Sequence, residues 1–113
     1  MPLYETVFVT RQDLSQGQND EFAKKMQTIV KDAGGKVANT EYWGLRQMAY
    51  KINKNKKGHY TLIHTDGPSA AKDELERNLR LSEDVLRFLT VRIEKLPDGP
   101  SPILRKKDEG EAA

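Results

Sequence analysis

The chain of 113 residues has no cysteine, only two histidines and few aromatic side chains. The absence of cysteine excludes disulfide bonds, thiol nucleophiles and thiolate metal ligands. No apolar run approaches the roughly 20 residues that a helix needs to cross a bilayer. The first residues, Met1-Pro2-Leu3-Tyr4-Glu5, lack the basic and then apolar layout of a secretory signal. We therefore expect a cytoplasmic protein without membrane contact, whose length suits one modest core.

Charge is distributed unevenly along the chain. Residues 36–64 hold six basic side chains and only one acidic one, a net charge of +5, which leaves −3 for the rest of a chain whose total is +2. The basic residues of this segment are Lys36, Arg46, Lys51, Lys54, Lys56 and Lys57, against Glu41. A near-neutral protein with one strongly basic segment has a candidate surface for polyanions such as nucleic acid. The alternative is a solvated hairpin whose lysines only keep the protein soluble.

The first half of the chain predicts a strand, a helix and a long second strand. Residues 3–10 are rich in β-branched and aromatic side chains, which favours a strand. Ser15 and Gln18 have the spacing of a capping box at a helix start. The apolar stripe of that helix is Phe22, Met26, Ile29, Val30 and Ala33, and Gly34-Gly35 ends it. Residues 37–52 then predict a strand in which Gly44 indicates a bulge or a close backbone approach.

The second half predicts a polar turn over 53–58, a strand over 59–65, a helix and a last strand over 85–93. Pro68 or Ser69 lies near the first turn of the helix, and Ala71, Leu75 and Leu79 mark its buried side. The order βαββαβ is the α+β, ferredoxin-like arrangement, with a four-stranded antiparallel sheet and both helices on one face. We place this domain at residues 1–96. Residues 97–113, rich in proline and charge, are expected to form a flexible tail.

Residue patterns that carry catalysis are missing. His59 and His64 are five residues apart in one predicted strand, so they point to opposite faces and cannot bind one metal ion together. No Ser-His-Asp set, glycine-rich phosphate loop or metal-spaced acid pair occurs. The sequence therefore predicts no enzyme activity, no metal site and no cofactor.

The third strand begins like the signature of the RNA recognition motif, with Lys57 and Gly58. That motif stacks RNA bases on aromatic rings at the third and fifth places of the signature. Here these places hold His59 and Thr61, and threonine has no ring. We interpret the match as a coincidental start, and keep an independent single-strand RNA-binding module as the alternative function.

The stretch Gly44-Leu45-Arg46-Gln47-Met48-Ala49-Tyr50-Lys51-Ile52 is the most specific motif in the chain. With the lysines, Gly58 and Tyr60 that follow, it resembles the family of ribosomal protein six of the bacterial small subunit. Weaker matches are Tyr4-Glu5, Leu79-Arg80-Leu81 and Val85-Leu86-Arg87, so the resemblance covers roughly residues 3–93. It implies a ferredoxin-like protein that binds small-subunit ribosomal RNA in the platform together with ribosomal protein eighteen, and is a monomer outside the ribosome.

The resemblance also implies site residues. The RNA-facing candidates are Arg46, Lys51, Lys54, Lys56, Lys57 and Arg87, and the set shared between the core and the protein partner is Trp43, Leu45, Met48 and Tyr50. Strand alternation separates Trp43 and Leu45 from Met48 and Tyr50 unless a bulge at Gly44 shifts the phase. A third class, an acylphosphatase-like enzyme on the same fold, needs a basic anion-binding loop. The loop at 11–18 has no glycine-lined cradle for one.

Overall fold

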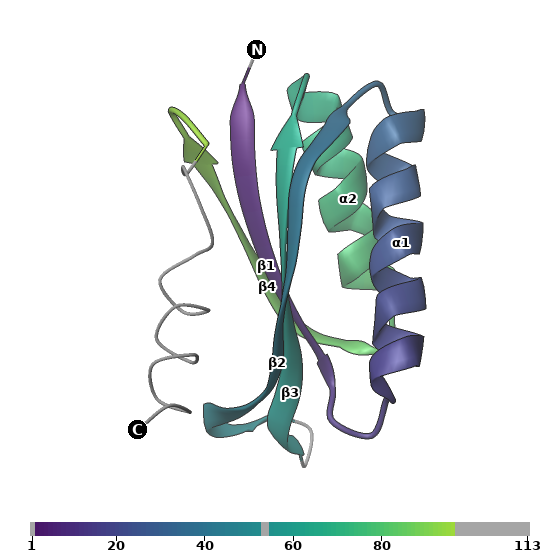
Figure 1. The fold of residues 1–113 in the computed structure, drawn as a ribbon, viewed down its shortest axis with the longest axis vertical. Helices are drawn as coiled ribbons and strands as arrows, with labels where there is room; N and C mark the ends of the chain where they lie inside the picture. Colours follow the sequence, from purple (N-terminus) through teal and green to yellow (C-terminus); the bar gives the residue numbers. More distant parts are fainter. Residues whose placement is uncertain (1, 53–54, 97–113) are drawn as a thin grey trace.

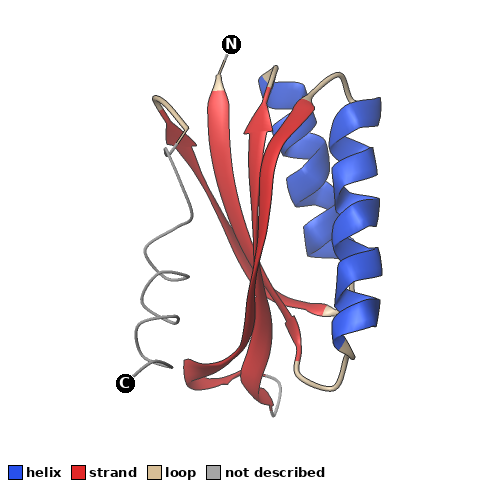
Figure 2. Cartoon of the chain, viewed as in Figure 1, coloured by secondary structure: helices blue, strands red, loops and turns tan. Residues whose placement is uncertain are grey.

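The computed structural model describes residues 2–52 and 55–96, the side chains of 49–52 and 55 excepted. These residues form β1 (Leu3–Arg11), α1 (Gln16–Asp32), β2 (Lys36–Ile52), β3 (Asn55–Asp66), α2 (Ser69–Leu81) and β4 (Val85–Ile93). The strands pair antiparallel in the order β2-β3-β1-β4. Figure 1 shows both helices on one side of the sheet, and Figure 2 shows the resulting two layers. The predicted ferredoxin-like fold is confirmed.

The central strand β1 shows how the two faces of the sheet differ. Phe8 pairs with Thr61 and Phe88, and it belongs to the core under the helices. Its neighbour Val7 pairs with Leu62 and Leu89 on the other side, because successive side chains of a strand alternate between faces. We call the side away from the helices the open face. Its rows of register partners are Asn39–His64–Glu5–Val91, Glu41–Leu62–Val7–Leu89 and Gly44–Tyr60–Val9–Arg87.

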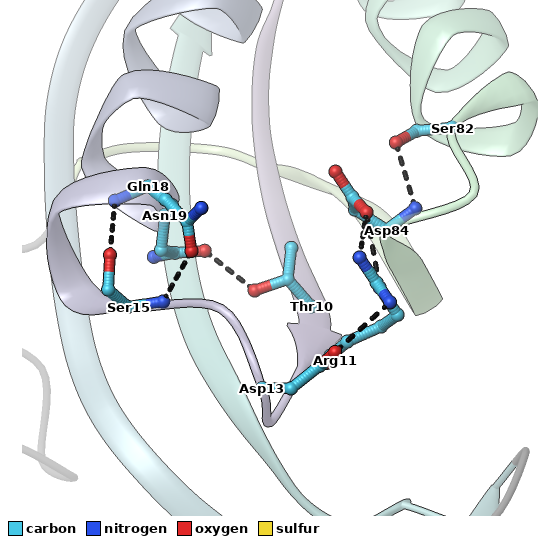
Figure 3. Close-up of polar contacts among 8 residues, drawn as sticks. All are labelled: Thr10, Arg11, Asp13, Ser15, Gln18, Asn19, Ser82 and Asp84. Carbon is cyan, nitrogen blue, oxygen red and sulfur yellow. Dashed lines mark hydrogen bonds and ion pairs between the residues drawn. The ribbon is translucent and has the colours of Figure 1, made fainter.

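Helix α1 begins where the sequence predicts it. The Ser15 hydroxyl accepts a hydrogen bond from the Gln18 backbone N–H, and the Gln18 side chain accepts one from the Ser15 N–H (Figure 3). This capping box satisfies two backbone donors that the first helical turn leaves without intrahelical partners. The core cluster consists of Phe8, Ala23, Met26, Val30, Ile63, Ala71, Leu75 and Leu79. The stripes predicted for both helices therefore face the sheet.

A buried polar link joins α1 to the sheet. Asn19 is fully buried in the first turn of the helix. Its side-chain oxygen accepts a hydrogen bond from the Thr10 hydroxyl at 2.6 Å (Figure 3), and its amide donates to the Thr61 hydroxyl at 3.1 Å. Both threonines are themselves buried. This link fixes the start of α1 against β1 and β3 in a way that apolar packing alone would not.

Strand β3 is longer than the sequence suggested. It starts at Asn55, so most of the predicted turn at 53–58 is strand, with Gln47 opposite Lys57 and Arg46 opposite Gly58. Pairing uses backbone groups, so polar side chains do not prevent it when they can point into solvent. Gly58 permits the close approach of β1, because a Cβ there would lie 2.3 Å from Val9 Cγ1.

Candidate nucleic-acid interface

The β2–β3 hairpin presents the exposed lysines of the basic segment. Lys56 and Lys57 are both exposed, and the Lys57 backbone N–H donates to the Gln12 side chain at 3.2 Å, which ties the hairpin to the loop before α1. The Lys51 side chain and the whole of Lys54 lie outside the described residues. Two of the six predicted RNA-facing residues therefore form a solvent-exposed pair at the end of the sheet.

Arg46 lies close to this pair but makes a structural contact of its own. It is half-buried opposite Gly58, and its Nε donates to the Trp43 carbonyl oxygen at 3.0 Å. Its Nη2 is buried without a hydrogen-bond partner in the structure. One edge of the guanidinium thus holds the backbone of β2, while the buried Nη2 retains hydrogen-bonding capacity for a further acceptor.

Arg87 lies on the opposite edge of the sheet. It is exposed on β4 and pairs with Val9, which in turn pairs with Tyr60 of β3. Arg87 therefore shares the open face with Arg46, although β1 and β3 separate the two strands that carry them. Arg46, Lys56 and Lys57 thus lie at neighbouring positions of the β2–β3 pairing, with Lys57 on the face opposite to Arg46 and Lys56, and Arg87 lies apart.

A bulge in β2 decides where the predicted partner residues point. The register with β3 shifts between Tyr42 and Gly44, and Gly44 has a φ of 91°, a left-handed conformation that favours glycine. Because the extra residue reverses the alternation, Trp43 and Met48 fall on the open face, and both are buried. Leu45 pairs with the helix-facing His59 and is 47% exposed. The Tyr50 side chain lies outside the described residues.

His59 and Thr61 face the helices, and both are buried. Thr61 bonds Asn19, as described above. The His59 Nε2 lies 2.6 Å from the Leu14 carbonyl oxygen, to which it donates, and Nδ1 lies 2.7 Å from the Tyr42 hydroxyl. Burial, with a smaller contribution from the charge of Asp20, raises the pKa of Tyr42 above its ordinary value. The two places that would stack bases in an RNA recognition motif are therefore used inside this domain.

The open face also holds a polar row that the sequence reasoning missed. Glu5 of β1, His64 of β3 and Asn39 of β2 are register partners, although the first two are 59 positions apart in the chain. The Asn39 amide lies 3.2 Å from His64 Nδ1 and 3.3 Å from Glu41 Oε2. The predicted separation of the two histidines onto opposite faces is confirmed. Only the strand register could have shown that His64 meets Glu5.

The loop after β1 is closed by ion pairs (Figure 3). Arg11 donates from Nε and Nη2 to one carboxylate oxygen of Asp84 at 3.1 and 2.7 Å, and from Nη1 to Asp13 at 3.2 Å. These acids neutralise the one basic side chain of the loop, so the loop offers no open cradle for an anion. Among residues 2–52 and 55–96, no group of three histidine or acidic side chains is placed to hold a metal ion. In the same part of the chain, no helix is long and apolar enough to span a membrane.

Comparison with known proteins gives one consistent answer. Residues 3–92 match the family model of ribosomal protein S6. The chain is 52% identical to small ribosomal subunit protein bS6 of Cereibacter sphaeroides, over 96% of this chain and 83% of that protein. It is 53% identical to the bS6 protein of Hyphomonas neptunium, over 96% of both chains. A crystal structure of 30S ribosomal protein S6 from Thermotoga maritima has the same fold, with a TM-score of 0.76 at 24% identity, covering 99% of this chain and 98% of that one. The chain belongs to the ribosomal protein S6 family.

Proposed function

We propose that this protein is a structural constituent of the small ribosomal subunit that binds small-subunit ribosomal RNA together with ribosomal protein eighteen. Its family membership supports the assignment to the small subunit, and hence a ribosome-bound place in the cytoplasm. The observation that carries the RNA contact is the exposed pair Lys56 and Lys57, in a segment with a net charge of +5. The mechanism is binding without turnover: lysines neutralise phosphates and release counterions.

Two features of the site weigh against the other functions considered for this fold. A single-strand RNA-binding module needs rings at the places of His59 and Thr61, and both side chains are buried under the helices. An acylphosphatase-like enzyme needs a basic loop open to an anion, and the Arg11 guanidinium is held by Asp84 and Asp13. RNA helices are recognised largely through their shape and backbone, which suits exposed lysines without a stacking platform.

The salt dependence of RNA binding tests the lysine contact. We expect affinity to fall as salt rises, and the slope of log affinity against log salt to become shallower by about one when Lys56 or Lys57 is changed to alanine. Lys25→Ala is the matched control, because Lys25 is exposed on α1, on the other layer of the domain. An unchanged slope in both hairpin variants would contradict the assignment of these lysines to phosphate.

Titration with both proteins tests the partner. The exposed basic pair is small, so we expect the protein alone to bind ribosomal RNA weakly. Ribosomal protein eighteen should then tighten this binding by about 1 to 3 kcal/mol, and by linkage the effect must be equal in the other direction. Leu45, which is 47% exposed, is the residue that we assign to the partner, with Tyr50 as a further candidate; the predicted Trp43 and Met48 are buried and shape this part of β2. Equal RNA affinity with and without ribosomal protein eighteen would favour an independent module.

A further inference from the structure

His64 is a fully buried histidine on the open face, where the helices do not cover the sheet. Its register partners are Glu5 on one side and Asn39 on the other. The charged groups near it on this face are Glu5 from β1, Glu41 and Lys36 from β2, and Asp66 from β3, while β4 contributes the apolar Val91 to the same row. The charged side chains around the His64 imidazole are therefore mostly acidic.

The hydrogen bonds of the row indicate which nitrogen of the neutral ring carries the proton. The Asn39 amide nitrogen faces both His64 Nδ1 and a carboxylate oxygen of Glu41, and only an NH₂ group can donate to both. Nδ1 must then accept, so the neutral ring carries its proton on Nε2. That nitrogen points at Glu5 Oε1 from 3.4 Å and is buried without a hydrogen-bond partner. The Nε2 of His64 thus points toward the Glu5 carboxylate without forming a hydrogen bond to it.

Glu5 is accessible on its other flank. Its side chain is 33% exposed. Next to it on β4, Val91 pairs directly with Glu5, and Leu89 lies one row further along the open face, 61% exposed. An acid beside exposed apolar side chains is complementary to a protein segment that carries lysine or arginine next to an apolar residue. The same acid would repel RNA phosphate, so this flank suits a protein partner.

We propose that Glu5, with Leu89 and Val91, receives a cationic side chain of a basic protein partner, and that His64 makes this contact proton-dependent. With His64 neutral, the Glu5 carboxylate is available to the partner. When His64 takes one proton from solvent on Nδ1, the imidazolium pairs with Glu5 and competes with the partner's cation. The Asn39 amide then loses its acceptor on the ring. Binding of the partner must therefore oppose protonation of His64.

The experiment uses the full chain and ribosomal protein eighteen, so it rests on the proposed function. Binding is measured by calorimetry from about pH 8 to about pH 5.5, the range in which histidine ordinarily changes charge, in two buffers of different ionisation enthalpy. We expect affinity to fall by up to about fivefold toward the acidic end, as for one partly exposed ion pair. Near the pH at which the affinity changes most steeply, binding of ribosomal protein eighteen to the wild-type chain should release protons to the buffer.

Three variants assign the effect to residues. His64→Gln, which stays neutral, should keep the affinity of the higher pH and lose the additional pH dependence of the wild-type chain. Glu5→Gln should bind more weakly at the higher pH and lose the same dependence. Glu83→Gln, a matched change of an exposed acid in the loop after α2, should behave like the wild-type chain. An identical pH dependence in the wild-type chain and in His64→Gln overturns the inference, since the titrating group then belongs elsewhere.

A second measurement, which needs only the wild-type chain, tests the inference if His64→Gln does not fold. The chain has only two histidines, so both imidazole rings can be followed by NMR in the wild-type protein. The titration midpoint of His64 should fall on complex formation, while that of His59, on the helix-facing side, should not move. A His64 midpoint unchanged by binding overturns the inference and leaves the proposed function intact. Absence of binding at every pH overturns the proposed partner, and the inference with it.

Discussion

Replacing Asn19 with alanine should destabilise this domain more than its place in the first turn of a helix would indicate. Asn19 is fully buried, and it both accepts a hydrogen bond from Thr10 and donates one to Thr61. Alanine removes both bonds and leaves two buried hydroxyl groups on the sheet without these partners.

The expected cost follows from these two bonds. A buried neutral hydrogen bond contributes about 1 kcal/mol, and a stranded buried polar group costs about 1 to 3 kcal/mol. We therefore expect the free energy of unfolding to fall by about 2 to 4 kcal/mol. For a domain of this size each kcal/mol lowers Tm by about 4 to 8 °C, so Tm should fall by roughly 8 to 32 °C.

Thermal and urea denaturation measure this loss of stability. Two further variants of the chain show whether the loss comes from the buried hydrogen bonds. Gln16→Ala changes an exposed residue at the same helix end and should stay within about 0.5 kcal/mol of wild type. Combining Asn19→Leu with Thr10→Val and Thr61→Val replaces all three polar groups by apolar ones of similar shape, which should recover much of the stability. A loss below about 1 kcal/mol in Asn19→Ala, or a triple variant less stable than Asn19→Ala, would refute the reasoning.

Three other outcomes are expected. Gly58→Ala should lower the free energy of unfolding by about 1 to 3 kcal/mol, because its Cβ would lie 2.3 Å from Val9 Cγ1; unchanged urea denaturation would show that β1 can yield. The pKa of Tyr42 is raised, first by burial and then by Asp20, so its ionisation opposes folding: stability should be unaffected below about pH 10 and should fall as pH rises through the folded pKa. Tyr42→Phe should flatten this alkaline loss in stability measured against pH. Deleting everything after Leu96 should leave Tm nearly unchanged if the domain ends there, and a large fall would place the boundary later.

The sequence by itself determined the order of the elements and the family. Periodicity is a local property, so the stripe of Met26 and Val30 predicted the buried side of α1 without knowledge of its partner. The capping residues Ser15 and Gln18 act within one helical turn, and the structure confirms them. The sequence also predicted that the hairpin lysines are exposed, since long charged side chains in a polar segment stay in solvent.

The tertiary structure alone decided which side chains meet. The bulge at Gly44 reverses the alternation of β2, and this is why Trp43 and Met48 share the open face although five positions separate them. The sequence indicated a bulge there but not its register, because register depends on how β2 pairs with β3. The contact of Glu5 with His64 likewise exists only through the pairing of β1 with β3. Neighbours distant along the chain are set by the packing of the whole sheet, and no local pattern encodes them.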